Sequence, residues 1–408
     1  MDVSNQTIFQ NIYRAYLLEL GKNKLSIDQR KAIYAITACR SGELGTSYYQ
    51  CLEGHALHEQ HHSCRHRSCY VCSRGSQHDW VEAQKRRLLN CPHFHLVFTL
   101  PSEYRVLWQY NTAWFARTLF ACVQETVMTL MQDERHHGLT PGLLATLHTW
   151  GRQLNLHPHI HCLVTAGGVD RHGQWHPTGD YLLPVQALKI LYRGKLQARI
   201  KEAFEADDIR LPPDMDAVAF MQHFKQAYAK AWSVRVEEQY RHGKGVVLYL
   251  SRYMKGGPLH PRQITHCNAQ SIGFNYKDHR DGRRKVLTLS PMAFLKRLLC
   301  HVPPKGIHTV RHYGLYAAAS RSKRNASREQ MGDLSEVETG TGADWRSVVM
   351  LTCRACGSPM QCRYRSGKSR IAKGISIIKS GASSVVQQIV ETDIANVARG
   401  RDPCKIQV

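Results

Sequence analysis

Apolar residues near the N-terminus recur with a helical period. Ile8, Ile12 and Leu20 fall on one face at a spacing close to 3.6 residues, which predicts a helix. A second helix is expected from Ser26 through Ala38. From Cys39 to Cys72 the pattern dissolves into Cys, His, Gly and Ser, which is typical of a chain held by metal rather than by apolar burial.

The middle of the chain alternates between strand and helix patterns. A short helix is expected over 79–89, and HFHLVFTLP then reads as a strand ended by Pro101. Residues 104–137 predict a long helix. The segments LLATLHTW and HIHCLVTAGGV predict two strands, which we expect to pair as an antiparallel hairpin across the polar segment GRQLNLHP.

Further helices are expected over 185–205, over 216–242 and in VVLYLSRYMK, which Gly256 and its neighbours terminate. The segment IGFNYKDHRDGRRKVLTLS predicts a hairpin with its turn near Asp281–Gly282. From Ser320 onward the composition shifts to Ser, Arg, Gly and Glu, which is consistent with a linker.

The net positive charge of the chain indicates what kind of molecule it binds. The 408 residues include 55 Lys and Arg against 32 Asp and Glu, a formal charge of +23, and 43% of them are hydrophobic. Enough apolar residues are present to bury a core, so a disordered polycation is excluded. The chain lacks a signal-peptide pattern and an apolar run long enough for a membrane span. We therefore expect a soluble cytoplasmic protein that binds nucleic acid.

Cysteines and histidines cluster in QCLEGHALHEQHHSCRHRSCYVCS. Because 14 cysteines in a reducing compartment are not expected to form a disulfide framework, the cluster predicts a structural zinc site, with a redox CxxC as the alternative. Five residues are the main candidate ligands: Cys51, His55, Cys64, Cys69 and Cys72. Four more residues are further options: Cys39, His61, His62 and His66.

Arginines are interleaved with these ligands. A zinc-held module would present Arg65, Arg67 and Arg74 to phosphate groups. A second CxxC, at Cys353 and Cys356, leaves metal binding open, because its only cysteine neighbours are Cys362 and the distant Cys404.

A His-x-His pattern lies in the second strand of the expected hairpin. Residues i and i+2 of a strand point to one face, so His159 and His161 can bind one cation together. His148 lies in the partner strand and is the expected third ligand, ranked above His157, whose backbone is disturbed by the following proline. Three imidazoles with open coordination positions are typical of a catalytic metal. The softness of imidazole ligands suggests zinc or manganese. If a phosphate substrate supplied oxygen ligands, magnesium could also bind here.

A tyrosine pair follows downstream. Tyr249 and Tyr253 lie four residues apart, on one face of the expected helix. Either they form the edge of a buried stripe, or one of them acts as a nucleophile. A bound cation, with Arg252 and Lys255 nearby, would lower the tyrosine pKa from about 10.

These features together resemble a known family. The strand ending in FTL, the His-hydrophobic-His strand and the downstream tyrosines resemble the HUH endonucleases, which nick single-stranded DNA. The segments LHTWGRQLNLHPHIHCLVTAGGV, YLSRYMKGG and FNYKDHR…LTLS…HYGL resemble one branch, the rolling-circle transposases of the insertion-sequence ninety-one group. That branch also carries a Cys-rich N-terminal domain, although its first knuckle is commonly a cysteine pair, where this chain has Cys51 and His55.

The resemblance implies an α+β fold, with an antiparallel HUH palm and flanking helices beside a small N-terminal helical and zinc-binding domain. It divides the chain into a zinc-binding and DNA-binding domain over 1–88, a catalytic domain over 89–318, and a linker and tail over 319–408. The implied reaction is a transesterification in which Tyr249 or Tyr253 attacks single-stranded DNA and leaves a 5′-phosphotyrosine. The implied cofactors are Mg²⁺ or Mn²⁺ at the histidines and structural Zn²⁺ at the cysteines.

Single-stranded DNA at element ends and at the target is the implied partner, and the sequence indicates no protein partner. As a transposase the protein would be bacterial, and nucleoid-associated when bound to DNA. Two alternatives remain: a zinc-dependent DNA-binding protein without catalysis, and a zinc hydrolase with a three-histidine site. The first leaves the histidines and tyrosines without a role, and the second predicts activity that is indifferent to Tyr249 and Tyr253.

Overall fold

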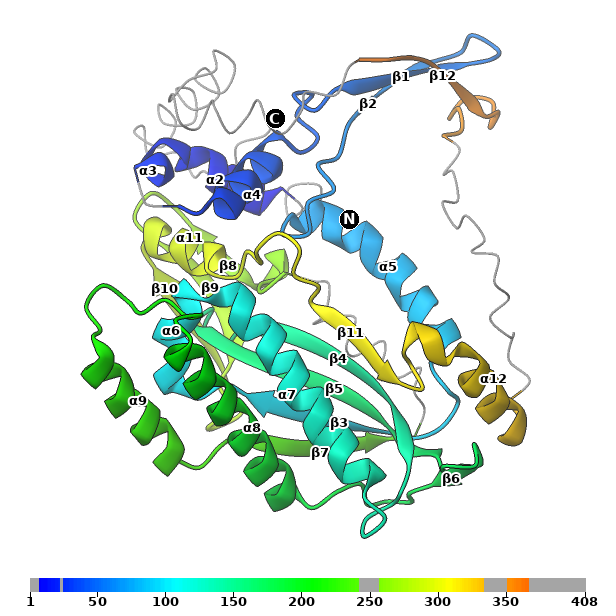
Figure 1. The fold of residues 1–408 in the computed structure, drawn as a ribbon. Coiled ribbons are helices and arrows are strands. Elements are labelled where there is room, and N and C mark those ends of the chain that lie inside the picture. The colour runs from blue at the N-terminus through cyan, green and yellow to red at the C-terminus, as the bar shows by residue number, and fades with distance from the viewer. Residues whose placement is uncertain (1–6, 23–24, 242–256, 334–350, 367–408) are drawn as a thin grey trace.

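A six-stranded antiparallel sheet forms the centre of the molecule (Figure 1). The structure, a computed structural model, describes residues 7–22, 25–241, 257–333 and 351–366. The strand order is β11-β4-β5-β3-β7, with β6 paired to β5. The strands are β3 (His93–Thr99), β4 (Thr140–Trp150), β5 (Leu156–Val169), β6 (Trp175–Pro177), β7 (Val234–Tyr240) and β11 (Val310–Gly314).

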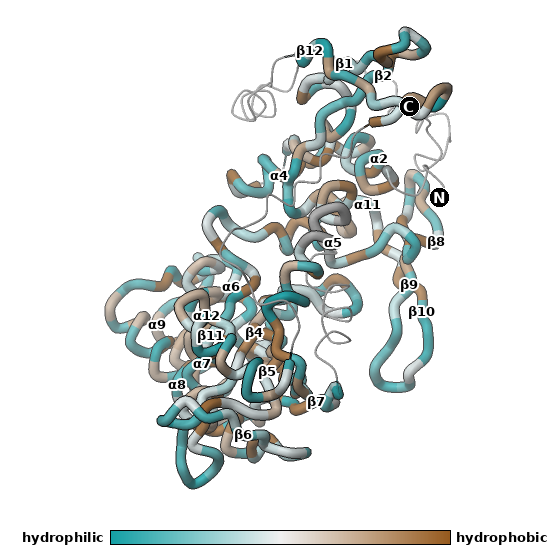
Figure 2. Tube along the Cα trace, turned by 90° about the vertical axis from the view of Figure 1, so that its right-hand side faces the viewer, coloured by the Kyte–Doolittle hydropathy of each residue, from teal (hydrophilic) through white to brown (hydrophobic). Residues whose placement is uncertain are grey.

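One face of this sheet is apolar and covered by helices. Alternation along β5 puts Ile160, Cys162 and Val164 on that face, where they join the main hydrophobic core. Figure 2 shows the covering helices on one side of the strands. They are α6 (Arg105–Tyr110), α7 (Thr112–Gln132), α8 (Val185–Glu205) and α9 (Ala217–Ala229), preceded by the short η1 (Ser102–Tyr104).

The opposite face of the sheet carries the polar residues that alternate with these apolar ones along β5. His159 and His161 share it with Leu163, which lies opposite Leu144 and belongs to one apolar cluster with Val81 of α5 (Tyr70–Arg87). The sheet therefore has one apolar face closed by helices, and a second face that combines histidines with a smaller apolar cluster.

A helical module precedes the sheet. It contains α2 (Ile8–Ala15), α3 (Leu17–Gly21) and α4 (Ile27–Ala38), and Ser26 and Gln29 form a capping box at the start of α4. This module shares a core with a second small sheet of order β10-β9-β8. The elements there are η2 (Pro261–Gln263), β8 (Ile264–Cys267), β9 (Ile272–Lys277), β10 (Arg284–Leu289) and α11 (Pro291–Leu299).

A third sheet joins distant parts of the chain. In Figure 1 β1 (Thr46–Cys51) lies between β2 (Leu57–His61) and β12 (Met360–Arg365), in the order β12-β1-β2. The register places Cys51 opposite Met360 and Tyr48 opposite Tyr364. The segment 351–366 therefore lies beside the Cys- and His-rich N-terminal segment, although the sequence pattern placed it in a separate tail.

The α+β fold class is confirmed, as are the antiparallel β4–β5 hairpin and the β9–β10 hairpin. Three local predictions were wrong. The helix expected over 104–137 is interrupted at Asn111, whose side chain donates to the Leu107 carbonyl at 2.9 Å and the Arg210 carbonyl at 2.8 Å. The helix expected over 216–242 ends at Ala229, because the segment VRVEEQY alternates with period two and forms β7.

The third difference is the expected linker after Ser320. It begins with the short η3 (Ala318–Ser320) and the helix α12 (Arg321–Gln330), in which Arg324 and Arg328 are buried. Among the described residues, no helix is both long and apolar enough to cross a membrane.

Candidate metal centres

Three histidines from two adjacent strands meet on the polar face of the central sheet. His148 of β4 lies directly opposite His159 of β5, and His161 follows two residues later on the same face. One ring nitrogen from each side chain lies within 4.8 Å of the others. The expected hairpin therefore does bring these three residues together.

Fixed contacts orient two of these rings. His159 Nδ1 lies 2.6 Å from the His157 carbonyl oxygen, and His161 Nδ1 lies 2.8 Å from Nε2 of His95 on the neighbouring strand β3. Both contacts use Nδ1, so the Nε2 atoms of His159 and His161 face each other at 3.0 Å. Metal-binding histidines are characteristically held through their other ring nitrogen in this way.

The geometry fits a divalent cation. Nitrogen ligands at about 2.1 Å from one ion lie about 3.0–3.4 Å apart, depending on whether the coordination is octahedral or tetrahedral. The 3.0 Å between the two Nε2 atoms falls in this range. Burial lowers the pKa of His159 to about 4 and holds the pKa values of His148 and His161 well below the usual histidine range. The imidazoles are therefore neutral at physiological pH, as metal ligands must be.

The contact from His95 was not foreseen from the sequence. The signal was present in HFHLVFT, where His95 alternates with Val97 and Thr99 on a strand. Its importance follows only from the register, which puts Val97 opposite His161 and so puts His95 on the same face of the sheet.

His157, the lower-ranked candidate, contributes its carbonyl rather than its ring. Its Nδ1 lies 3.1 Å from an Arg105 guanidinium nitrogen, and burial together with this cation lowers the His157 pKa to about 4. On the other side of the centre, the ring of Trp150 stacks on His148 with the centroids 4.7 Å apart. Trp150 also lines a cavity of about 340 Å³, together with Tyr70 and Trp108.

The predicted nucleophiles lie outside the described residues. Tyr249, Tyr253 and the neighbouring Arg252 and Lys255 all fall within residues 242–256.

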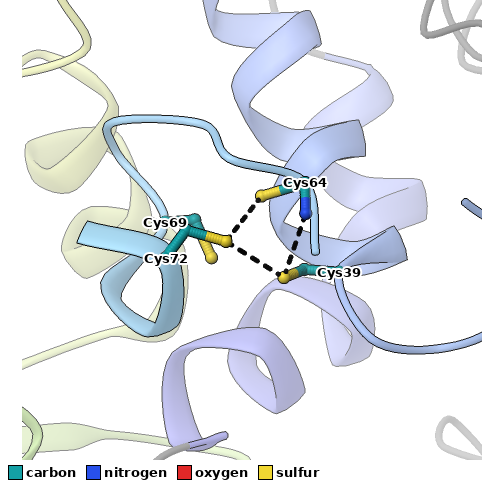
Figure 3. Close-up of side chains that lie close together, drawn as sticks. All are labelled: Cys39, Cys64, Cys69 and Cys72. Atoms are coloured by element: carbon teal, nitrogen blue, oxygen red, sulfur yellow. Dashed lines mark hydrogen bonds between the residues drawn. The ribbon is translucent and has the colours of Figure 1, made fainter. Parts of the chain in front are cut away.

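A second candidate metal centre is formed by four cysteines (Figure 3). Cys39 follows the last turn of α4, Cys69 caps the start of α5, and Cys72 lies in the first turn of α5. The Cys72 sulfur lies 3.5 Å from the sulfur atoms of Cys39 and Cys64. Sulfurs bound to one tetrahedral zinc lie about 3.8 Å apart, so the group fits this ion.

Backbone amides support this four-cysteine group. The N–H groups of Cys64 and Arg65 point at the sulfurs of Cys39 and Cys72, at 3.5 and 3.3 Å. Hydrogen bonds with the Cys39 and Cys64 thiols lower the pKa of Cys72, which favours its thiolate form. Cys39, named only as a further option from the sequence, is the fourth member, because the end of α4 brings it back to the CxxC turn.

The five main zinc candidates do not form one site. Cys64, Cys69 and Cys72 belong to the four-cysteine group, whereas Cys51 and His55 lie in a different group with Cys353 and Cys356. This division of the candidate ligands follows from where β1 ends. Cys51 ends β1 and His55 follows in the turn, so both lie at the end of the β12-β1-β2 sheet.

The arginines between the ligands differ in their surroundings. Arg65 is exposed. Arg67 is also exposed, and it donates to the backbone carbonyls of Ile307 and Pro304 at 2.6 and 2.9 Å. The backbone of Arg74 lies in α5, but its side chain is outside the description.

Comparison with known proteins gives two family matches. Residues 142–324 match a family described as "Putative transposase", and residues 8–100 match a "Transposase zinc-binding domain". The first match spans β4 and β5 with their three histidines, and the second spans the four-cysteine group.

Two curated relatives agree with these families. A protein named "Putative transposase y4qJ" from Sinorhizobium fredii is 32% identical over 80% of this chain and 83% of its own length. The "Transposase for insertion sequence element IS801" from Pseudomonas savastanoi pv. phaseolicola is 29% identical over 74% of this chain and 73% of its own length. No solved structure is significantly similar to the chain. The chain belongs to the insertion-sequence ninety-one group of transposases, with a zinc-binding domain of that group at its N-terminus.

Proposed function

We propose that this transposase nicks and rejoins single-stranded DNA through a 5′-phosphotyrosine, and so moves an insertion sequence by rolling-circle transposition. The phenolic oxygen of Tyr249 or Tyr253 attacks the scissile phosphorus, the bond to O3′ breaks, and the phenolic proton is released while the 3′-oxygen takes up a proton. The reverse reaction, with a new 3′-hydroxyl as the attacking group, rejoins the strand. The observation that carries the proposal is the three-histidine centre on the polar face of the sheet.

His148, His159 and His161 would hold a divalent cation, Mg²⁺ or Mn²⁺. When bound, such an ion polarises the phosphodiester and stabilises the negative charge that develops on it. The residues of the chain perform the orienting work. The His157 carbonyl and His95 fix the ring planes of His159 and His161, and burial keeps these rings unprotonated.

The basic charge supports a nucleic-acid substrate, and aromatic rings that line a cavity support one with unpaired bases. The formal charge of +23 favours a polyanion, and Arg235 lies on the same sheet face as His161, separated from it by Val97. Trp150, whose ring stacks on His148, lines a cavity together with Tyr70, and aromatic rings are the surfaces on which unpaired bases stack. Two tyrosines would permit two successive strand transfers.

The test uses 3′-labelled single-stranded oligonucleotides that carry the ends of the element. With Mn²⁺ the label should become attached to the protein, because the downstream fragment keeps the 5′-phosphate. The same oligonucleotides as a duplex, or with EDTA, should give no adduct. The double variant Tyr249→Phe/Tyr253→Phe should give none, whereas Tyr181→Phe, at an exposed tyrosine away from the centre, should react like the parent. Equal adduct from the double variant and the parent would refute the mechanism.

A further inference from the structure

The third sheet ends in a group of four metal-binding side chains that belong to two distant parts of the chain. We propose that Cys51, His55, Cys353 and Cys356 bind a second structural zinc ion. This ion would join the N-terminal hairpin to the segment 351–366 as one split zinc ribbon. The proposal rests on the cysteine and histidine geometry alone and is independent of the proposed DNA chemistry.

The distances fit a zinc site with three sulfurs and one nitrogen. The ligand atoms of all four residues lie within 4.8 Å of one another. The sulfurs of Cys51 and Cys356 are 3.5 Å apart, and Cys51 Sγ is 3.9 Å from His55 Nδ1. Ligands of one tetrahedral zinc are separated by about 3.3–3.8 Å, whereas a disulfide requires about 2.05 Å between its sulfurs.

Each pair of ligands lies in a tight turn closed by backbone hydrogen bonds. In the first turn Gly54 N–H donates to the Cys51 carbonyl at 3.0 Å, and Cys51 N–H donates to the Ala56 carbonyl at 3.0 Å. In the second turn Gly357 N–H donates to the Cys353 carbonyl at 2.8 Å, and Cys353 N–H donates to the Ser358 carbonyl at 2.8 Å.

Each turn contains a glycine with a left-handed backbone conformation. Gly54 has φ +75° and Gly357 has φ +73°, a left-handed region that side chains other than glycine rarely adopt. Two tight turns that together bring four ligand atoms to one place are the arrangement of a zinc ribbon.

The sheet that carries these turns has almost no apolar interior. All five residues of β2 are exposed, including Leu57 at 79%. In β1 and β12 the only buried apolar side chain is Cys51 itself. Small modules without a hydrophobic core usually depend on a metal or on disulfides for their stability. A bound zinc would supply the stabilisation that apolar burial does not supply here.

This group is separate from the four-cysteine group in its ligands and in its surroundings. Cys39, Cys64, Cys69 and Cys72 lie where α4 meets α5, next to the apolar core of the helical module. The proposed site lies at the end of an exposed sheet and includes a histidine. The two sites should therefore be loaded and emptied independently.

Zinc content of the purified full-length protein tests the proposal. All proteins in this comparison, including the parent, carry His159→Ala, so that zinc bound at the three histidines does not contribute to the count. The parent should hold two zinc ions per chain, and Cys353→Ser/Cys356→Ser should hold one. Cys362→Ser, a cysteine of the same segment outside the group, should hold two. Two zinc ions in the Cys353→Ser/Cys356→Ser variant, or only one in the parent, would overturn the proposal.

A conservative variant covers the case in which the double variant does not fold. His55→Cys should still bind two metal ions per chain, because it replaces a nitrogen ligand by a sulfur. After substitution with Co²⁺, the thiolate-to-metal absorption of His55→Cys should be stronger than that of the parent, by the intensity that one additional cysteine ligand contributes. Unchanged absorption would exclude His55 as a ligand and contradict the site as proposed.

Discussion

Histidines buried in the neutral state characterise this protein at the residue scale. The sequence predicts that His159 and His161 share one face, because side-chain direction repeats every two residues along a strand. It also predicts His148 as their partner, because the hairpin is short. It does not predict the support from His95, which depends on which third strand pairs with β5.

His95 should act as a positioning residue. Its Nε2 lies 2.8 Å from His161 Nδ1, and loss of such a support typically weakens metal binding about 10- to 100-fold. We therefore expect His95→Ala to raise the Mn²⁺ dissociation constant in calorimetric titration by about this factor, and His95→Gln to restore part of the loss. His176→Ala, at an exposed histidine outside the centre, should bind like the parent. Full affinity in His95→Ala would show that His161 needs no such support.

His93 should make stability dependent on pH. Its Nδ1 bonds the Cys91 carbonyl at 2.8 Å and its Nε2 contacts the Tyr316 hydroxyl at 2.6 Å, while Leu89 N–H donates to that hydroxyl. Burial lowers the His93 pKa from about 6.5 to about 4. The unfolded chain therefore binds more protons between these values, and its free energy falls relative to the folded state as the pH drops.

The expected size is about 2.5 kcal/mol of unfolding free energy lost through His93 between pH 7.5 and pH 4.5. Urea unfolding at both pH values should show a correspondingly smaller pH dependence in His93→Gln, in which this group no longer titrates. If parent and variant lose stability equally, His93 is not a source of the pH dependence.

At the scale of elements, periodicity predicts most of the central fold. The strands β3, β4 and β5 and the helix α8 all lie where the pattern of apolar residues predicts them. The pattern was misleading in two places. In α9 and β7, two different periods follow each other without a proline or a glycine between them. In α12, the residues that face inward are arginines rather than apolar side chains.

Arg324 should anchor α12 to the end of β11. It is 2% exposed, and its Nη1 donates to the carbonyls of Leu315 and Ala317 at 2.8 and 3.3 Å. Removal would leave these buried carbonyls without that donor, at a cost of about 2–4 kcal/mol. Arg324→Ala should lower Tm by several degrees in a thermal scan, whereas the exposed Lys323→Ala should change it little. Equal Tm values would mean that the buried guanidinium contributes no net stability.

At the scale of the whole molecule, two segments that lie far apart in the sequence meet in one sheet, where β1 pairs with β12. The sequence predicts that the cysteines near the N-terminus bind metal, but it does not divide them between two groups. That division depends on β12 pairing with β1 across about three hundred residues, and no local pattern encodes such a pairing. Cys353 and Cys356 could not be assigned partners from the sequence for the same reason.

The basic charge should make DNA binding strongly dependent on salt. The logarithm of the association constant for single-stranded DNA should fall linearly with the logarithm of salt concentration, because phosphate contacts release counterions. Arg235→Ala should reduce the magnitude of this slope by about one, which is the contribution of a single phosphate contact. Arg171→Ala, beyond the other end of β5, should leave the slope unchanged. A flat salt response in the parent would argue against a surface that follows the DNA backbone.

Peptide mapping of the covalent adduct tests the central claim most directly. The protein is incubated with a single-stranded element end and Mn²⁺, denatured and digested with protease and nuclease, and the nucleotide-bearing peptide is identified by mass spectrometry. The account predicts a nucleotide linked through its 5′-phosphate to Tyr249 or Tyr253. Cleaved DNA with no peptide adduct, or an adduct on a residue other than these two tyrosines, would contradict it.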